Sequence, residues 1–445
     1  MRKMKDSGIE WIGEIPKEWN RTSILNVLRK KITDGPHETP NLVENGIPFI
    51  SVDSLNDSKR IDLSVCKKFI TQEDFYEYSE KTQIEKGDIL FSKAATIGKT
   101  AIVYDEIFMV WSPLAIIKVD ESLAYNKYLY YVLNCPHLIK NISLSGSINT
   151  QINVGMRELE KAQIPVPPLY EQQTISAYLD DKCTKIDTII EKQQKIIKKL
   201  KKYKLSLITE TVTKGLNSEV SMKDSGIEWI GEINDTYFIT KIGKLCFVTK
   251  LAGFEYTDTM VNNISIDSDV PIVRAQNVRM FRFNKETINE YIDLSTSLKL
   301  NRCALTKKAL LITFIGAGIG DVCIIDEEDR FHLAPNVAKI EIRGEFKKTL
   351  LEEYLMYYIG SYAGKSEIFK IAKASAQPSL SMETIRGIKI VLPNLEEQQE
   401  IVDYLDKKCS AIDSSIEKKQ AIINKLKEYK KSLIYEYVTG KQEVK

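Results

Sequence analysis

MKDSGIEWIGEI, at residues 4–15, occurs again without a single change at residues 222–233, an offset of 218 residues. A second matching pair lies later in each half. IPVPPLYEQQTISAYLDDKCTKIDTIIEKQQKIIKKLKKYKLSLITETVT begins at Ile164, and IVLPNLEEQQEIVDYLDKKCSAIDSSIEKKQAIINKLKEYKKSLIYEYVT begins at Ile390. More than half of the positions in this pair are identical. The chain is therefore an internal duplication, and a repeat of this kind decides the fold before any local pattern does.

The stretches between the repeated segments are much less alike. The offset rises from 218 to 226, so this stretch is eight residues longer in the second half. Thin correspondences remain between GDILFSKAATIGKTAIV from Gly87 and ALLITFIGAGIGDVCII from Ala309, and between Gln151 and Gln377. Near-identical frames around divergent inserts predict one scaffold role performed twice and one recognition role performed on two different targets.

Each half closes with a stretch that lacks glycine and proline. The first follows Pro167-Pro168 and ends at about Thr213, and the second follows Pro393 and ends at about Thr439. Each stretch predicts one long helix, and apolar residues at seven-residue spacing predict that the two helices pack as a coiled coil. An ordinary amphipathic core helix would show the same pattern. The predicted seam consists of Leu179, Ile186, Gln193, Leu200 and Leu207 with Ile175, Ile189, Ile196 and Tyr203, widened by Ile190 and Ile197, and of Leu405, Ile412, Lys419, Leu426 and Leu433 with Ile401, Ile422 and Tyr429.

The length of these helices also bears on function. At roughly 1.5 Å per residue each is on the order of 60 Å long, comparable to two turns of duplex DNA at about 34 Å per turn. Such a helix pair can set the distance between two recognition heads. The lysines between Lys195 and Lys204 could contact phosphates, or they could form a solvated face.

Composition excludes several classes of protein. A chain of 445 residues is long enough for two domains plus spacers, and no apolar run is long enough to span a membrane. The charged N-terminal segment lacks the apolar core of a signal peptide, which predicts a cytoplasmic protein. Seven scattered cysteines without a C-x-x-C pair disfavour a disulfide framework and a zinc site. The net charge of +2 means that any DNA-binding face must be local.

Two strings resemble nucleotide-binding motifs and fail. KAATIGKT has Lys93 where a P-loop needs its first glycine, and GAGIGD has Asp321 where a dinucleotide fingerprint needs its third. No NPPF or DPPY string of a DNA methyltransferase occurs, and the three histidines are too dispersed for a metal or nuclease centre. We therefore expect no catalytic centre, no metal site and no bound cofactor in this chain.

As a set, the duplicated GIEWIGEI, the PLxEQQxI helix starts, DGPHETP (residues 34–40) and QPSLS (residues 377–381) resemble the specificity subunits of type I restriction–modification enzymes. The resemblance implies two target recognition domains, each reading one half of an asymmetric bipartite site in double-stranded DNA. It implies that the helices set the spacer and dock two methyltransferase subunits. It also implies association with restriction and translocase subunits. S-adenosylmethionine, ATP and magnesium are then used by the partner subunits and not by this chain.

The expected architecture is α+β, with two similar α/β target recognition domains separated by two long helices packed as an antiparallel coiled coil. We place the first domain at residues 1–165, the central helix at 166–215, the second domain at 216–391 and the C-terminal helix at 392–445. The rival interpretation is a two-headed coiled-coil scaffold that binds other proteins and no DNA.

Polar side chains on loops are the candidates for reading base edges, because they match the donors and acceptors of the DNA grooves. Turns of any globular domain collect the same residue types, which leaves each candidate open. In the first domain they are Asp34, His37, Glu38, Thr39, Lys93, Thr96, Lys99, Ser147, Asn149 and Gln151, and in the second Phe254, Tyr256, Arg274, Gln276, Asn277, Arg279, Asn336 and Gln377.

Overall fold

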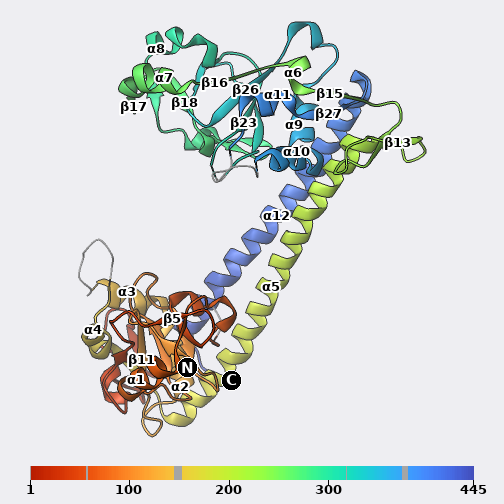
Figure 1. The fold of residues 1–445 in the computed structure, drawn as a ribbon. Helices are drawn as coiled ribbons and strands as arrows, with labels where there is room; N and C mark the ends of the chain where they lie inside the picture. The colour runs from red at the N-terminus through yellow and green to blue at the C-terminus, as the bar shows by residue number, and fades with distance from the viewer. Residues whose placement is uncertain (1, 57–58, 145–152, 317, 373–378, 445) are drawn as a thin grey trace. The chain divides into compact units, whose positions relative to one another are not determined.

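The computed structural model describes residues 2–56, 59–144, 153–316, 318–372 and 379–444 (Figure 1). These residues form two compact units. Unit 1 comprises residues 1–193 and 420–445, and unit 2 comprises residues 194–419. Each long helix therefore has one half in each unit, so that each unit contains the start of one long helix and the end of the other.

Unit 1 is built around two four-stranded sheets, ordered β4-β11-β8-β9 and β10-β6-β7-β5. Its core packs Leu90, Leu114 and Ile116 of the first sheet with Ile50 and Val110 of the second. The strands are β1 (Met4–Asp6), β2 (Glu14–Pro16), β3 (Asn20–Ser23), β4 (Thr33–Asp34), β5 (Leu42–Val43), β6 (Ile47–Ile50), β7 (Phe69–Ile70), β8 (Ile89–Ser92), β9 (Thr100–Ile102), β10 (Met109–Val110), β11 (Leu114–Ile117) and β12 (Gln163–Val166), and the helices are α1 (Gln72–Thr82), α2 (Asn126–Leu133), α3 (Pro136–Leu144), α4 (Met156–Lys161) and the first half of α5 (Leu169–Lys214).

Unit 2 repeats this plan with sheets ordered β16-β26-β23-β24 and β17-β21-β18-β25-β22. Its strands are β13 (Met222–Asp224), β14 (Glu232–Asn234), β15 (Phe238–Lys241), β16 (Cys246–Lys250), β17 (Ile264–Ser265), β18 (Val270–Val273), β19 (Val278–Arg279), β20 (Arg282–Phe283), β21 (Tyr291–Ile292), β22 (Ala304–Leu305), β23 (Ala309–Thr313), β24 (Val322–Ile325), β25 (Phe331–Leu333), β26 (Val337–Ile342) and β27 (Lys389–Leu392), and its helices are α6 (Ile242–Leu245), α7 (Gly253–Glu255), α8 (Leu294–Lys299), α9 (Glu352–Gly360), α10 (Tyr362–Ala372), α11 (Met382–Gly387) and the first half of α12 (Leu395–Val438).

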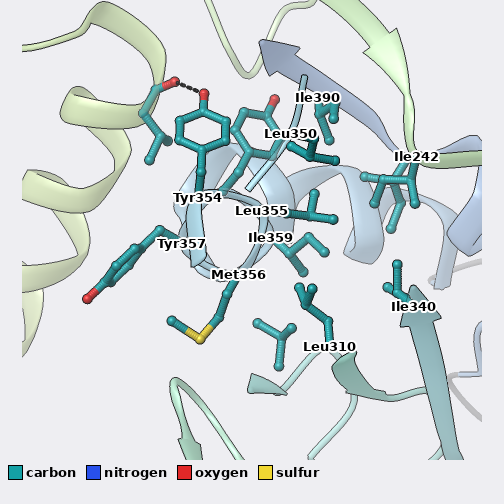
Figure 2. Close-up of a cluster of buried hydrophobic side chains, with 14 of the residues drawn as sticks. Ile242, Leu310, Ile340, Leu350, Tyr354, Leu355, Met356, Tyr357, Ile359 and Ile390 are labelled. Atoms are coloured by element: carbon teal, nitrogen blue, oxygen red, sulfur yellow. Dashed lines mark hydrogen bonds between the residues drawn. The ribbon is translucent and has the colours of Figure 1, made fainter. Parts of the chain in front are cut away.

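The core of unit 2 shows how its domain is attached to the long helices. Figure 2 shows α9 with Leu355 and Ile359 facing Leu310 and Ile340 of the sheet, while Tyr354 and Tyr357 lie toward the other side. The cluster continues into Ile208 and Val212 of α5 and into Leu405 of α12. One continuous apolar core therefore joins the domain to both helices within this unit.

A buried tyrosine ties each domain to the end of one long helix. The Tyr128 hydroxyl donates to the carbonyls of Pro165 and Val438, each at 3.0 Å. In unit 2, the Tyr354 hydroxyl donates to Val391 at 2.8 Å and to Val212 at 3.0 Å. The repeat is residue for residue, with the roles of α5 and α12 exchanged.

The start of each long helix is held in the same repeated way. The Gln172 side chain accepts from the Tyr125 amide and donates to the Pro167 carbonyl, and Gln398 makes the matching bonds with Leu351 and Pro393. Both glutamines are fully buried. Because an unpaired buried amide costs free energy, these bonds fix the point at which each helix leaves its domain.

Within each unit the two helices run antiparallel. In unit 1, Asp187 of α5 pairs with Lys430 of α12 and Tyr178 packs on Tyr437, so positions ascend in α5 as they descend in α12. In unit 2, Lys204 of α5 pairs with Asp413 of α12. This confirms the predicted antiparallel pairing and the duplicated α+β fold.

The predicted seam needs one correction. Leu179, Ile186, Leu405, Ile412 and Leu433 are buried, and Gln193, Leu200, Leu207, Lys419 and Leu426 are half-buried, as a seam requires. Five other predicted seam residues are exposed, so their assignment was wrong. They are Ile189 (43%), Ile196 (38%), Tyr203 (57%), Ile422 (44%) and Tyr429 (57%).

The reason lies in which flank of the stripe each helix buries. A second buried row lies four residues after seam positions 179, 186 and 193 in α5 and 405 and 419 in α12. It consists of Cys183, Ile190 and Ile197 and of Cys409 and Ile423, whereas Ile416 is half-buried. The predicted seam instead uses positions three residues after seam positions. These are Ile189, Ile196 and Tyr203 in α5 and Ile422 and Tyr429 in α12. Both flanks carry apolar residues, so periodicity alone could not choose between them.

Candidate nucleic-acid interface

In unit 1, the loops at one end of the β4-β11-β8-β9 sheet lie together. We call residues 34–39, 51–54, 93–99 and 111–113 loop cluster 1. Lys93 follows β8, and its amide donates to the Pro113 carbonyl ahead of β11. The Lys99 ammonium lies 3.4 Å from the Val52 carbonyl. Sheet topology thus brings together four segments that are far apart in the sequence.

Asp34 is the charged centre of loop cluster 1. Its carboxylate lies 2.9 Å from Lys93 Nζ and 3.3 Å from His37 Nε2. A side chain at Gly35 would lie 2.0 Å from the Val110 carbonyl, so the loop can pass strand β10 only as glycine. The structure therefore brings two sequence candidates, Lys93 and His37, to a third, Asp34.

The exposure of these side chains separates their roles. Lys93 is 12% exposed, whereas His37 is 74% exposed. Glu38, Thr39 and Thr96 are also exposed. A hollow of about 540 Å³ lies beside the loop and is lined by Asp34, His37, Glu38, Lys81 and Met156 among others. His37, Glu38, Thr39 and Thr96 are therefore accessible from solvent, whereas Lys93 is held against Asp34 of the loop that carries His37.

Sequence reasoning missed Trp111 in this cluster. Its ring lies 4.2 Å from the Lys68 ammonium and 6.1 Å from the Phe49 ring, and it is only partly buried. A partly buried indole next to a cation is suited to stacking and backbone contacts. Its position in an isolated VWSP string gave no periodic or motif signal.

Unit 2 assembles the equivalent loop cluster 2 from residues 251–256, 274–279, 314–316, 318–321 and 334–336. The Phe314 amide donates to the Asn336 carbonyl, and the Ala334 amide donates to Val273 at the end of β18. Phe254 is 70% exposed, and Gln276, Arg279 and Asn336 are exposed as well. These four are the side chains of the cluster most available to DNA.

Arg274 and Tyr256 are less free than the sequence implied. The Arg274 guanidinium pairs with Glu290, with 2.7 Å from its Nε to the carboxylate. Burial would lower the pKa of Arg274, but hydrogen bonds to Glu290 and Tyr256 raise it overall. Arg274 is thus a fixed cation whose contact with DNA would compete with Glu290.

Asn277 must be withdrawn as a base-reading candidate. It is 1% exposed. Its side chain accepts from the Arg274 amide at 2.8 Å and donates to the Thr287 hydroxyl at 2.9 Å. A short polar side chain that closes a turn is indistinguishable in sequence from one that faces a ligand.

Four candidates cannot be placed, because Ser147, Asn149, Gln151 and Gln377 lie outside the described residues. His332 lies in β25, is fully buried and contacts the carbonyls of Leu300 and Leu333. Its burial lowers its pKa. His137 stacks on Tyr435 with ring centroids 4.1 Å apart. These two histidines are structural.

Among the described residues, no group of three or more His, Cys, Asp or Glu side chains is arranged to hold a metal ion. Likewise, the described part of the chain contains no helix with the length and apolarity needed to cross a bilayer.

The long helices present a repeated exposed surface. In unit 1, Ile422 and Tyr429 are exposed on α12, and in unit 2, the equivalent Ile196 and Tyr203 are exposed on α5. Each pair is separated by seven residues and therefore lies on one face of its helix. An apolar pair repeated in this way is a candidate protein-docking surface.

Comparison with known proteins agrees with the duplicated plan. A family model described as "Type I restriction modification DNA specificity domain" matches residues 16–202 and 268–428. The chain is 27% identical over 444 residues to the putative type I restriction enzyme MjaX specificity subunit of Methanocaldococcus jannaschii, covering 98% of this chain and 96% of the relative. It is 24% identical over 411 residues to the MjaVIII specificity subunit of the same organism, covering 91% and 88%.

A solved chain described under "complex assembly and conformational transition of the type I R-M system" has the same fold. The TM-score is 0.70 at 13% identity, covering 96% of this chain and 99% of that one. The two family matches include most of both loop clusters and the greater part of both long helices. The chain therefore belongs to the type I restriction–modification DNA specificity subunits.

Proposed function

We propose that each domain reads one half of an asymmetric, bipartite site in double-stranded DNA for a type I restriction–modification complex. The observation that carries this proposal is the contrast between the repeated contacts and the unrepeated loops. The tyrosine and glutamine bonds that attach each domain to the helices recur residue for residue. The loop clusters share the same place on the same sheet but differ in chemistry.

The differences predict two different half-sites. Loop cluster 1 offers an Asp34–Lys93–His37 charge group beside a hollow, whereas loop cluster 2 offers exposed Phe254, Gln276 and Arg279. Base edges are distinguished by their donors, acceptors and methyl groups. Two clusters with different donors and acceptors therefore read different sequences, and the complete site is asymmetric.

The exposed Ile422 and Tyr429 pair and the matching Ile196 and Tyr203 pair support docking of two copies of one partner. We assign these surfaces to two methyltransferase subunits, with restriction and translocase subunits joining the assembly through them. In this arrangement the partners use S-adenosylmethionine, ATP and magnesium, and the chain itself carries out no catalytic step.

The methylated bases of cells that express the complex test this proposal. We expect methylation at a bipartite sequence with two unlike halves and a fixed non-specific spacer. A continuous or palindromic methylated site would contradict it. A purified complex should also bind this site in a salt-dependent manner, and binding with no sequence preference would support a scaffold role instead.

Shortening both long helices by one heptad at equivalent positions, residues 190–196 and 416–422, tests their role in spacing. We expect the number of base pairs between the half-sites to change while both half-sites are retained. An unchanged spacer would show that the helices do not set it.

A further inference from the structure

In both domains, a short segment begins within the loop cluster and continues toward the helical frame. We call residues 51–61, without 57–58, arm 1, and residues 274–283 arm 2. Both follow the parallel strand that ends at Ile50 or Val273. Arm 1 closes with a bridge between Leu55 and Ile61, and arm 2 closes with the β19–β20 pairing of Val278 and Phe283. The arms are therefore equivalent elements.

Each arm is also attached to the edge strand of the four-stranded sheet. The Ile102 amide of β9 donates to the Lys59 carbonyl at 2.8 Å, and the Phe281 amide donates to the Val322 carbonyl of β24 at 2.8 Å. The two bonds lie two residues apart on the edge strand, since Val322 corresponds to Thr100 and not to Ile102. Lys59 and Phe281 are matched instead by the equivalent tyrosine that each side chain contacts, Tyr131 or Tyr357.

The side chains at these positions enter the same niche of the helical frame. In unit 1, Tyr131 donates to Asp180 at 2.7 Å, and in unit 2, Tyr357 donates to Asp406 at 2.6 Å. Burial raises the pKa of both phenols. The niche is thus built from residues that the duplication preserved.

The side chain that fills the niche differs between the halves. Lys59 forms an ion pair with Asp180, and its ammonium lies 5.0 Å from the Tyr131 ring centroid. In unit 2 the Phe281 ring lies 5.4 Å from the Tyr357 ring, and the Lys204 ammonium lies 5.5 Å from the Phe281 centroid. One half is joined by charge and the other by aromatic packing.

Backbone geometry shows that the Phe281 contact is specific. Phe281 has φ of +63°, a left-handed conformation that bulky residues rarely adopt. A side chain at Gly360, at the end of α9, would lie 2.2 Å from its ring. The equivalent residue in the first half is Asn134. The bulky ring therefore fits into the niche because Gly360 has no side chain there, in agreement with a specific contact.

We propose that Lys59 and Phe281 are positioning residues that hold the two arms, and with them the base-reading loops, against a common niche on the long helices. The proposal rests on the proposed function, because the loops must read DNA for their position to matter. It predicts that half-site 1 depends on the Lys59–Asp180 charge pair and half-site 2 on the Phe281–Tyr357 ring contact.

The arms have the connections that such a role requires. Val52 of arm 1 accepts from the Lys99 ammonium of loop cluster 1. Arm 2 includes Gln276 and Arg279, two of the exposed candidates, and its first turn is closed by Asn277. A displaced arm would therefore move the reading side chains and leave the attachment of the domain through Tyr128 or Tyr354 in place.

The test uses the complete chain in its methyltransferase complex and duplexes altered at one half-site or the other. Lys59→Ala and Asp180→Asn should reduce discrimination at half-site 1 by about tenfold, as expected for loss of a hydrogen-bonded charge. Lys59→Arg should retain it. Phe281→Ala should reduce discrimination at half-site 2 alone, by a similar factor.

Asp406→Asn is the matched control. Asp406 occupies the position of Asp180, but it accepts from the Tyr357 hydroxyl rather than pairing with an arm lysine, and the asparagine oxygen is still an acceptor for that hydroxyl. We expect reading of both half-sites to survive this substitution. The proposal is overturned if Lys59→Ala weakens both half-sites equally, or if it lowers thermal stability without changing discrimination.

Hydrogen exchange separates this proposal from the proposed function. In Lys59→Ala, peptides that contain the Ile102 amide should exchange faster, and peptides around Phe281 should not. If the wild-type complex shows no sequence preference, the proposed function fails, and unchanged exchange at Ile102 would independently show that Lys59 does not hold the arm.

Discussion

Lys430 Nζ lies 2.7 Å from both carboxylate oxygens of Asp187. The equivalent lysine and aspartate, Lys204 and Asp413, pair at 2.6 Å in unit 2 with the helices exchanged. Both pairs are partly exposed, with Asp187 at 38% and Asp413 at 50%, so each contributes little alone.

A double-mutant cycle on Lys430 and Asp187 should give a coupling of about 0.5–1 kcal/mol, because partly exposed ion pairs are screened by solvent. Urea unfolding of Lys430→Ala, Asp187→Ala and the double variant measures it. Lys431, which pairs with Glu428 of its own helix, serves as control. A coupling of zero would mean that the pair does not contribute to holding the helices.

Tyr354→Phe should destabilise the protein by about 1–3 kcal/mol, since two buried carbonyls, Val212 and Val391, lose their shared donor. Tyr128→Phe should have a similar effect in the other half. Thermal unfolding measures both, with the exposed Tyr362→Phe as reference. If neither variant differs from Tyr362→Phe, the attachment depends on packing alone.

Gly360→Ala should destabilise unit 2 by about 1–3 kcal/mol, because the new methyl group would overlap the Phe281 ring. Gly344→Ala is the control, since a methyl group there would have no heavy atom within 4 Å. Calorimetry of both variants decides the matter. Equal unfolding temperatures would contradict the fitted contact.

Gln276→Ala should relax recognition at one half-site, with a loss of roughly 1–3 kcal/mol of discrimination if it reads a base edge. Arg274→Ala should relax the same half-site, because the Arg274 side chain holds the neighbouring turn through Glu290. Binding titrations with single-base variants of the site measure this. Equal weakening on all sequences would instead identify a phosphate contact.

Thiol labelling at neutral pH should modify Cys66 first. Burial raises the pKa of Cys183 and Cys409 to about 11, so the reactive thiolate is scarce until the pH approaches that value. Cys66 is the one cysteine that is not buried. Mass spectrometry after iodoacetamide treatment, with and without urea, checks this. Rapid native labelling of Cys183 would contradict the buried helix contact.

The duplication, the α+β class and the long helices could all be predicted because they depend on repeated strings and on proline-free stretches. The buried flank of the seam could not, since Ile196 and Ile197 are equally apolar and only packing distinguishes them. Asn277 was misassigned for a similar reason, because capping and base reading select the same side chain.

The arms were invisible in the sequence for a different reason. Lys59 and Phe281 share no chemical property, and their correspondence appears only in the structure, where each contacts the equivalent tyrosine, Tyr131 or Tyr357. Asp180 and Asp406 lie in the repeated segments, whereas Tyr131 and Tyr357 lie in the divergent stretches, and nothing in the sequence indicates what packs against them.

The fit between the Phe281 ring and Gly360 has an evolutionary consequence. A change at either position is harmful unless the other changes with it, so the two should be inherited as a pair. Among relatives, an aromatic residue at the position of Phe281 should accompany glycine at that of Gly360. A lysine at the position of Lys59 should be compatible with a residue larger than glycine, such as Asn134, at the position that corresponds to Gly360. Domains exchanged between family members would have to include the matching residue at the position of Gly360.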